Sequence, residues 1–171
     1  MTLKAMRLKL VPALLCFLAY TSVAQPNDLS AWHGVWQGKM YMYRAGKVKD
    51  SVQIRLTVAP TASANEWIWK TEYLSPTIPV VKDYKMRMND PAGNVLVVDE
   101  GDGIELLTYR FNQKLFNVFE TSGFMLTSTY ELINETIIFE VSSGTKVPSE
   151  QSAVTNYTVM NLQRAVLQRI P

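Results

Sequence analysis

The chain has 171 residues, of which 47% are hydrophobic and 19% are charged, with a formal net charge of +2. This length is near the usual size of one domain and is long enough to bury a sizeable core. The single cysteine and the small net charge exclude a disulfide scaffold and a strongly basic nucleic-acid-binding protein.

The N-terminal segment has the three parts of a secretory signal peptide. A basic start is followed by an apolar core over residues 10–20 and by small residues at 22–24. The apolar core is roughly half the ~20 residues that a membrane-spanning helix requires. We therefore expect residues 1–24 to be a signal peptide, removed after Ala24, and the mature protein to be periplasmic or secreted.

Two other interpretations of this segment stay open, an uncleaved membrane anchor and a lipoprotein modified at Cys16. Leu15 argues against the lipoprotein, because lipidation favours a small residue before the cysteine. Cys16 is the only cysteine, so the mature chain, residues 25–171, has no disulfide and depends on its core. An exported chain without disulfides fits a bacterial periplasm or exterior better than an animal secretion.

Removal of the signal peptide changes the charge balance. Residues 1–24 hold three of the 17 basic residues and none of the 15 acidic ones, which leaves a net charge of about −1. No basic patch remains that would indicate nucleic acid as a partner, and no polybasic arm for a membrane surface.

The mature chain alternates short apolar segments with tight turns along its whole length. Val52, Ile54 and Leu56, for example, alternate with polar residues, which is the period of a half-buried strand. Turns such as 45–47 and 101–103 contain glycine, which supplies the positive φ of hairpin loops. The pattern predicts ten strands, at residues 33–44, 47–59, 66–74, 79–89, 94–100, 103–111, 114–121, 124–132, 136–143 and 153–166.

Ten strands joined by short loops predict an all-β fold. We expect one antiparallel up-and-down β-barrel of about 8–10 strands, because closure removes the unpaired edges of a long meander. A two-sheet sandwich is the main alternative, although it needs long crossovers and only 60–65 and 144–152 are long enough. An outer-membrane barrel is a further alternative, disfavoured by the patchy alternation over 103–111.

The first predicted strand carries Gly34, Trp36 and Gly38 on one face. The two glycines leave room beside the indole ring for another chain segment. In a closed barrel that segment is the last strand, from which an arginine could stack on Trp36. Arg164 is the preferred candidate over Arg169, because the face that it shares with Leu162 and Met160 is expected to point inward.

This combination resembles the lipocalin and calycin superfamily. Gly34-Val35-Trp36 on the first strand and Arg164 on the last resemble the pair that closes one end of the barrel in that family. The resemblance implies that Gly34, Trp36 and Arg164 close the barrel and that its cavity binds small apolar ligands. It covers the two chain ends and the strand meander, but the chain lacks the family's C-terminal helix, disulfide and second motif. The alternative is that Trp36 is an ordinary core aromatic.

Trp67, Trp69 and Tyr73 share one face of the third predicted strand. Together with Tyr84 and Met86 they are the predicted ligand-binding wall, because large rings and adaptable methionine side chains suit irregular apolar ligands. Two alternatives are ordinary core packing and an outward apolar face for a partner.

No catalytic or metal-binding pattern stands out. His33 is the only histidine, and metal sites rarely manage with one. A Ser-His-Asp triad would need His33, but its position at a strand start indicates an ordinary surface or rim residue. The acidic segment 99–103 lacks calcium-loop spacing and is expected to be a hairpin turn. Nothing selects a glycosidase pair from the candidate carboxylates Asp83, Asp99, Glu105 and Glu120. We expect no metal, no cofactor and no enzymatic activity.

The sequence therefore predicts an exported binding module for a small apolar or amphipathic ligand, without a membrane span. A structural or interaction protein of the cell envelope with a filled barrel is the first alternative. A carboxylate-based hydrolase is the second, which a pocket holding two close carboxylates with raised pKa values would favour.

Overall fold

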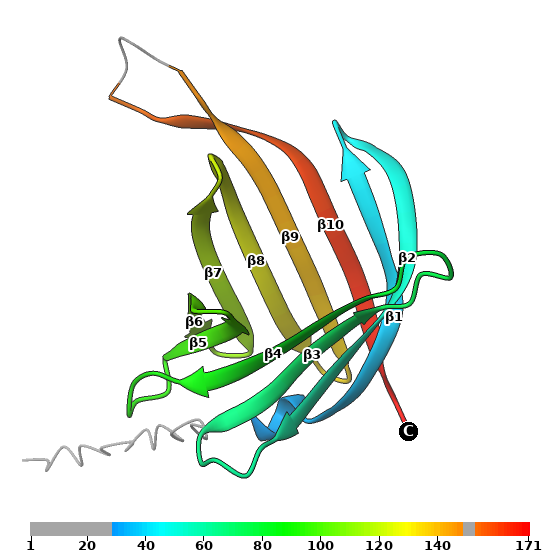
Figure 1. Ribbon diagram of the computed structural model, residues 1–171, viewed down its shortest axis with the longest axis vertical. Coiled ribbons are helices and arrows are strands. Elements are labelled where there is room, and N and C mark those ends of the chain that lie inside the picture. The colour runs from blue at the N-terminus through cyan, green and yellow to red at the C-terminus, as the bar shows by residue number, and fades with distance from the viewer. Residues whose placement is uncertain (1–28, 149–152) are drawn as a thin grey trace, which may run out of the picture.

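The computed structural model describes residues 29–148 and 153–171, which form one closed antiparallel β-barrel (Figure 1). Residues 1–24, with the expected cleavage after Ala24, lie outside the described residues. The elements are the 3-10 turn η1 (Ser30–Trp32) and strands β1 (Gly34–Arg44), β2 (Lys47–Pro60), β3 (Glu66–Tyr73), β4 (Val80–Met88), β5 (Val95–Gly101), β6 (Ile104–Phe111), β7 (Lys114–Thr121), β8 (Phe124–Ile133), β9 (Thr136–Val147) and β10 (Asn156–Ile170).

Each strand pairs with the one before it, and β10 pairs with β1 to close the barrel. The predicted all-β barrel is confirmed, and the sandwich alternative is wrong. The hairpin turns follow from local chemistry. Ala45 and Gly46, for example, join β1 to β2 with φ values of 49° and 75°, and two successive positive φ angles suit the twist of paired strands.

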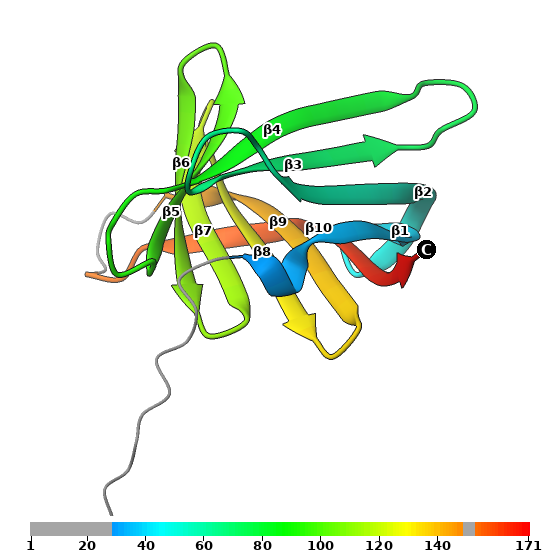
Figure 2. The same cartoon turned by 90° about the horizontal axis from the view of Figure 1, so that it is seen from below.

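The barrel has two unlike ends. At the closed end lie η1 and the C-terminal part of β10, seen from below in Figure 2. At the open end lie the β1–β2 and β7–β8 hairpin tips, together with the end of β9 and the start of β10, toward the top of Figure 1. Buried inward side chains concentrate toward the closed end, where Trp36, Leu115, Ile137 and Leu167 each lie within a few residues of a strand terminus.

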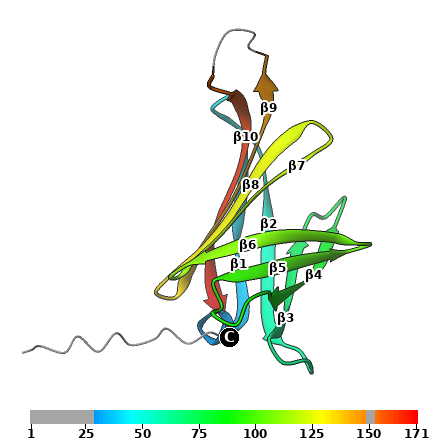
Figure 3. The ribbon, with the colours of Figure 1, turned by 90° about the vertical axis from the view of Figure 1, so that its left-hand side faces the viewer.

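The β5–β6 hairpin is joined to its neighbours only near the closed end. β4 pairs with β5 over 85–88 and 96–99, and β6 pairs with β7 over 109–111 and 114–116. Beyond these short ladders the strands diverge toward the open end, as Figure 3 shows for β6 against β7 and β8. The barrel interior is therefore wider toward its open end than at its floor.

Candidate ligand-binding cavity

The floor of the barrel is built around Trp36, which is fully buried. Its indole Nε1 donates a hydrogen bond to the backbone oxygen of Trp32 at 2.9 Å. The guanidinium carbon of Arg169 lies 4.1 Å from the centre of the Trp36 ring. Arg169 also donates to the backbone oxygens of Ala31, at 3.0 Å, and His33. These contacts tie β1, η1 and β10 together.

The two glycines of the first strand make this approach possible. A Cβ atom at Gly34 would lie 2.6 Å from Nη1 of Arg169, and one at Gly38 would lie 2.1 Å from the backbone oxygen of Val166. Either methyl group would force β10 or its arginine away from β1. The glycines therefore allow the close packing of β10 that seals the floor.

The arginine on Trp36 is Arg169, and the sequence-based choice of Arg164 is wrong. β10 continues to Ile170, and its register sets Trp36 opposite Arg169. Arg169 lies on the same face of the strand as Ala165, which is buried, whereas Met160 is 50% exposed. The inward face of β10 is therefore the one that carries Arg169. Arg164 instead points outward and pairs with Glu140 on β9 at 2.9 Å.

Above the floor a cavity of about 360 Å³ occupies the barrel interior. It is lined from eight strands, β3 to β10, by both polar and apolar side chains. The lining residues are Trp69, Thr71, Tyr73, Lys82, Tyr84, Val98, Glu100, Leu106, Asn117, Phe119, Leu126, Ser128, Tyr130, Phe139, Val141 and Gln163.

A row of aromatic rings separates this cavity from the filled floor. Trp69 lies between Trp32, at 5.8 Å between ring centres, and Tyr130, at 5.1 Å in an edge-on arrangement. Tyr130 then stacks on Phe139 at 4.2 Å. Burial raises the pKa of Tyr130, so its hydroxyl keeps its proton well into the alkaline range.

Three of the five predicted wall residues line the cavity: Trp69, Tyr73 and Tyr84. The other two, Trp67 and Met86, face each other across β3 and β4 in the buried core and do not line it. Because β3 runs from the floor toward the open end, the first inward residue of the strand packs in the core, whereas later ones reach the cavity.

Sequence reasoning missed a polar cluster on β4 and β5. The ammonium nitrogen of Lys82 lies 5.6 Å from the ring centre of Tyr84, and both line the cavity with Glu100. A hydrogen bond with Tyr84 raises the pKa of Lys82. Burial raises the pKa of Tyr84, and a hydrogen bond with Glu100 adds to the rise, while Lys82 opposes it. Alternation from Tyr84 and Met86 could have identified Lys82, but nothing local identifies Glu100.

Asn117 on β7 was also missed. It is only 5% exposed, and its Nδ2 donates to Thr108 Oγ1 at 3.3 Å. That hydroxyl in turn donates to the backbone oxygen of Leu106 at 3.3 Å. This chain directs the amide nitrogen toward Thr108 and leaves Asn117 Oδ1 with no hydrogen-bond partner among the residues that the structure describes.

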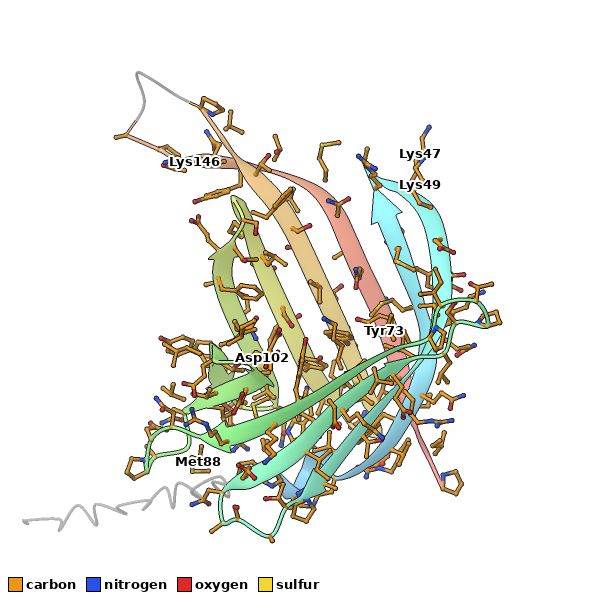
Figure 4. The ribbon with its side chains drawn as sticks, in the orientation of Figure 1. Lys47, Lys49, Tyr73, Met88, Asp102 and Lys146 are labelled. Atoms are coloured by element: carbon orange, nitrogen blue, oxygen red, sulfur yellow. The ribbon has the colours of Figure 1, made fainter. Side chains whose placement is uncertain are left out.

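Tyr73, Lys82 and Gln163 line both this cavity and a second hollow of about 850 Å³, which the β3–β4 loop borders. A hydrogen bond of 2.8 Å from the backbone nitrogen of Leu74 to the oxygen of Gln53 holds the start of that loop. In Figure 4, Tyr73 lies well below Lys47 and Lys49 at the β1–β2 tip.

The candidate carboxylates do not meet in this cavity. Glu105 pairs with Arg87, and Glu120 accepts a hydrogen bond from Tyr157 at 2.9 Å. Asp99 accepts one from the backbone nitrogen of Gly101. Neither these three nor Asp83 is among the lining residues.

Over residues 29–148 and 153–171 no three His, Cys, Asp or Glu side chains are placed to hold a metal ion. In the same part of the chain no helix is long and apolar enough to cross a membrane.

Comparison with known proteins supports the fold but no particular family. No protein-family model matches this sequence, and neither does any curated protein. The crystal structure of Rv2717c from M. tuberculosis is similar, with a TM-score of 0.52 and 12% identity over 86% of this chain and 99% of that chain. The fluorescent protein UnaG gives a TM-score of 0.47 and 11% identity over 84% and 100% of the two chains. The similarity to Rv2717c supports the β-barrel fold alone.

Proposed function

We propose that this protein is an exported, non-enzymatic binding module that holds a small amphipathic ligand inside its barrel. The observation that carries the proposal is the interior cavity of about 360 Å³ above a sealed floor. Ligand pockets in proteins typically measure ~300–1,000 Å³, and barrels of about this size can enclose one small ligand.

The lining of the cavity favours a ligand over a purely structural barrel. A barrel that served only as a structural element would be expected to fill its interior with apolar side chains at ordinary packing density. Here Thr71 and Asn117 are buried, Ser128 and Glu100 are half-buried, and the exposed Lys82 also borders the cavity. Burying polar groups is costly unless they are hydrogen-bonded, and a bound amphipathic molecule would supply partners for them.

Titration with a neutral fluorescent probe, N-phenyl-1-naphthylamine, tests the proposal. Trp69 lines the cavity, so bound probe should quench tryptophan emission and saturate at one site per chain. Val141→Phe should weaken binding at least tenfold, because the added ring occupies the cavity. Val166→Phe is the matched control, since Val166 is exposed on the outer face of β10 and its enlargement should leave binding unchanged.

Two results would contradict this proposal. Absence of saturable binding to the unsubstituted protein would favour the envelope structural protein instead. Equal binding by Val141→Phe would place the probe outside the barrel.

Export is the second part of the proposal, supported by the basic start, the short apolar core and the small residues at 22–24. The intact mass of the protein recovered from the periplasm or medium should correspond to a chain that begins at Gln25. A recovered chain that retains residues 1–24 would contradict export by a cleaved signal, and a lipid-modified mass at Cys16 would establish the lipoprotein alternative.

A further inference from the structure

The charged side chains that line the cavity are one cation and one anion, Lys82 and Glu100. They come from neighbouring strands at the place where backbone pairing has stopped. The β4–β5 ladder ends at the pair of Lys85 and Asp99, so Tyr84 and Glu100 lie just beyond it toward the open end. Their side chains are therefore placed where β4 and β5 are no longer paired.

Tyr84 lines the cavity together with both charges, and the ammonium nitrogen of Lys82 lies 5.6 Å from the centre of its ring. Burial raises the pKa of the Tyr84 hydroxyl, Lys82 lowers it and Glu100 raises it. The cluster thus presents a donor, an acceptor and a hydroxyl to the cavity, with no net charge. Part of the β7–β9 lining is apolar, formed by Phe119, Leu126 and Val141.

From this arrangement we infer that the ligand carries an uncharged polar group with both a hydrogen-bond donor and an acceptor, such as a carboxamide or lactam, attached to an apolar ring system. The polar group contacts Lys82, Tyr84 and Glu100, and the ring system contacts the β7–β9 wall. The inference rests on the proposed function and adds the chemical class of the ligand.

The charges at the site exclude simple ions by repulsion. A ligand carboxylate attracted by Lys82 would also face Glu100, and a ligand ammonium attracted by Glu100 would face Lys82. In a partly desolvated site, a like-charge contact opposes the gain from the favourable one. A neutral group that accepts from Lys82 and donates to Glu100 satisfies both partners without a repulsive contact.

Asn117 adds to the same preference deeper in the cavity. Its chain of hydrogen bonds through Thr108 leaves a carbonyl oxygen as the group without a partner. This oxygen is enclosed by protein atoms, so it acts on a ligand only through its partial negative charge, which opposes a carboxylate in the neighbouring cavity. Two parts of the lining therefore disfavour an anionic ligand.

Three compounds with the same ring test the inference by calorimetry on the mature protein at pH 7: 1-naphthamide, 1-naphthoate and 1-naphthylmethylammonium. The amide should bind at least tenfold more tightly than either ion. Glu100→Gln should shift the preference toward the naphthoate, and Lys82→Gln should shift it toward the ammonium compound. Each shift should be about tenfold in the ratio of dissociation constants.

Lys85→Gln and Asp99→Asn are the matched controls, because these residues form the neighbouring cross-strand pair and do not line the cavity. They should leave the ratios unchanged. Equal binding of the amide and either ion, or ratios that Glu100→Gln and Lys82→Gln fail to move, would overturn the inference.

The probe N-phenyl-1-naphthylamine separates this failure from failure of the proposed function. If that probe saturates but none of the three naphthyl compounds binds, the inferred ligand class is wrong while the barrel remains a binding module. If the probe also fails to bind, the proposed function itself is wrong.

Discussion

The closed and open ends of the barrel are built from the same ten strands, but they differ in how the interior is used. At the closed end Trp36 is fully buried with the Arg169 guanidinium over its ring, and side chains fill the space. Toward the open end the strands diverge, a cavity remains, and Lys82 and Glu100 line it. The comparison indicates that packing at the floor supplies stability, while the region above it keeps the incompletely satisfied groups that binding needs.

Removing the central ring of the floor should have the largest effect on the free energy of unfolding. Trp36→Ala deletes a fully buried indole, and such truncations cost about 3–5 kcal/mol. Phe119→Ala should cost less than about 2 kcal/mol, because this ring borders a space that already lacks protein atoms on one side. Urea denaturation of the two variants measures the difference. Equal losses would mean that the two ends contribute equally to stability.

The two arginines of β10 give the next comparison. Arg169→Met removes a cation–π contact and charge-assisted hydrogen bonds to backbone oxygens, so we expect a loss of about 2 kcal/mol. Arg164→Met removes an exposed ion pair with Glu140, which is typically worth less than about 1 kcal/mol. Thermal or chemical unfolding of both variants distinguishes them. A larger loss for Arg164→Met would restore Arg164 as the residue that stabilises the barrel.

Alkaline pH should destabilise the barrel through Tyr130. Burial raises the pKa of this residue in the folded state above the ordinary value of 10.0. Its contribution to stability is therefore fully present below pH 10 and is lost as pH rises from there through the folded-state pKa. Each proton released only on unfolding lowers the free energy of unfolding by about 1.4 kcal/mol per pH unit.

Urea denaturation between pH 9 and pH 11 measures this slope, and Tyr130→Phe should flatten it. Tyr109→Phe is the control, because that side chain is exposed on the outside of the barrel. An unchanged slope in Tyr130→Phe would place the alkaline destabilisation elsewhere, with Tyr73 and Tyr84 as the next residues to substitute, since burial raises the pKa of both.

The smallest expected change in stability is for substitution of Asn117. Asn117→Leu removes a buried oxygen that has no partner and one hydrogen bond to Thr108. Because an apolar side chain of similar size suits a buried site, stability without ligand should change by less than about 1 kcal/mol. Thermal unfolding checks this. A loss near that of Trp36→Ala would show that the Asn117 oxygen is satisfied in the folded protein.

Part of the site could be read from alternation along single strands. Trp69, Tyr73 and Tyr84 follow from the period of two, and extension of the same faces would have added Thr71 and Lys82. Glu100 and Asn117 could not be identified in this way. Each joins the site only because the barrel brings β5 and β7 to the same cavity as β3 and β4.

What the sequence determined by itself was the ten-stranded barrel, because alternation and positive-φ turns are local properties and closure follows from the need to pair edges. Tertiary structure alone decided which face of β10 points inward. Apolar residues occur on both faces of that strand, and pairing with β1, together with an irregularity between Val159 and Asn161, sets the direction of Arg169. A one-residue change in register inverts every side chain, so this choice depends on neighbouring strands and is not encoded by the pattern of β10.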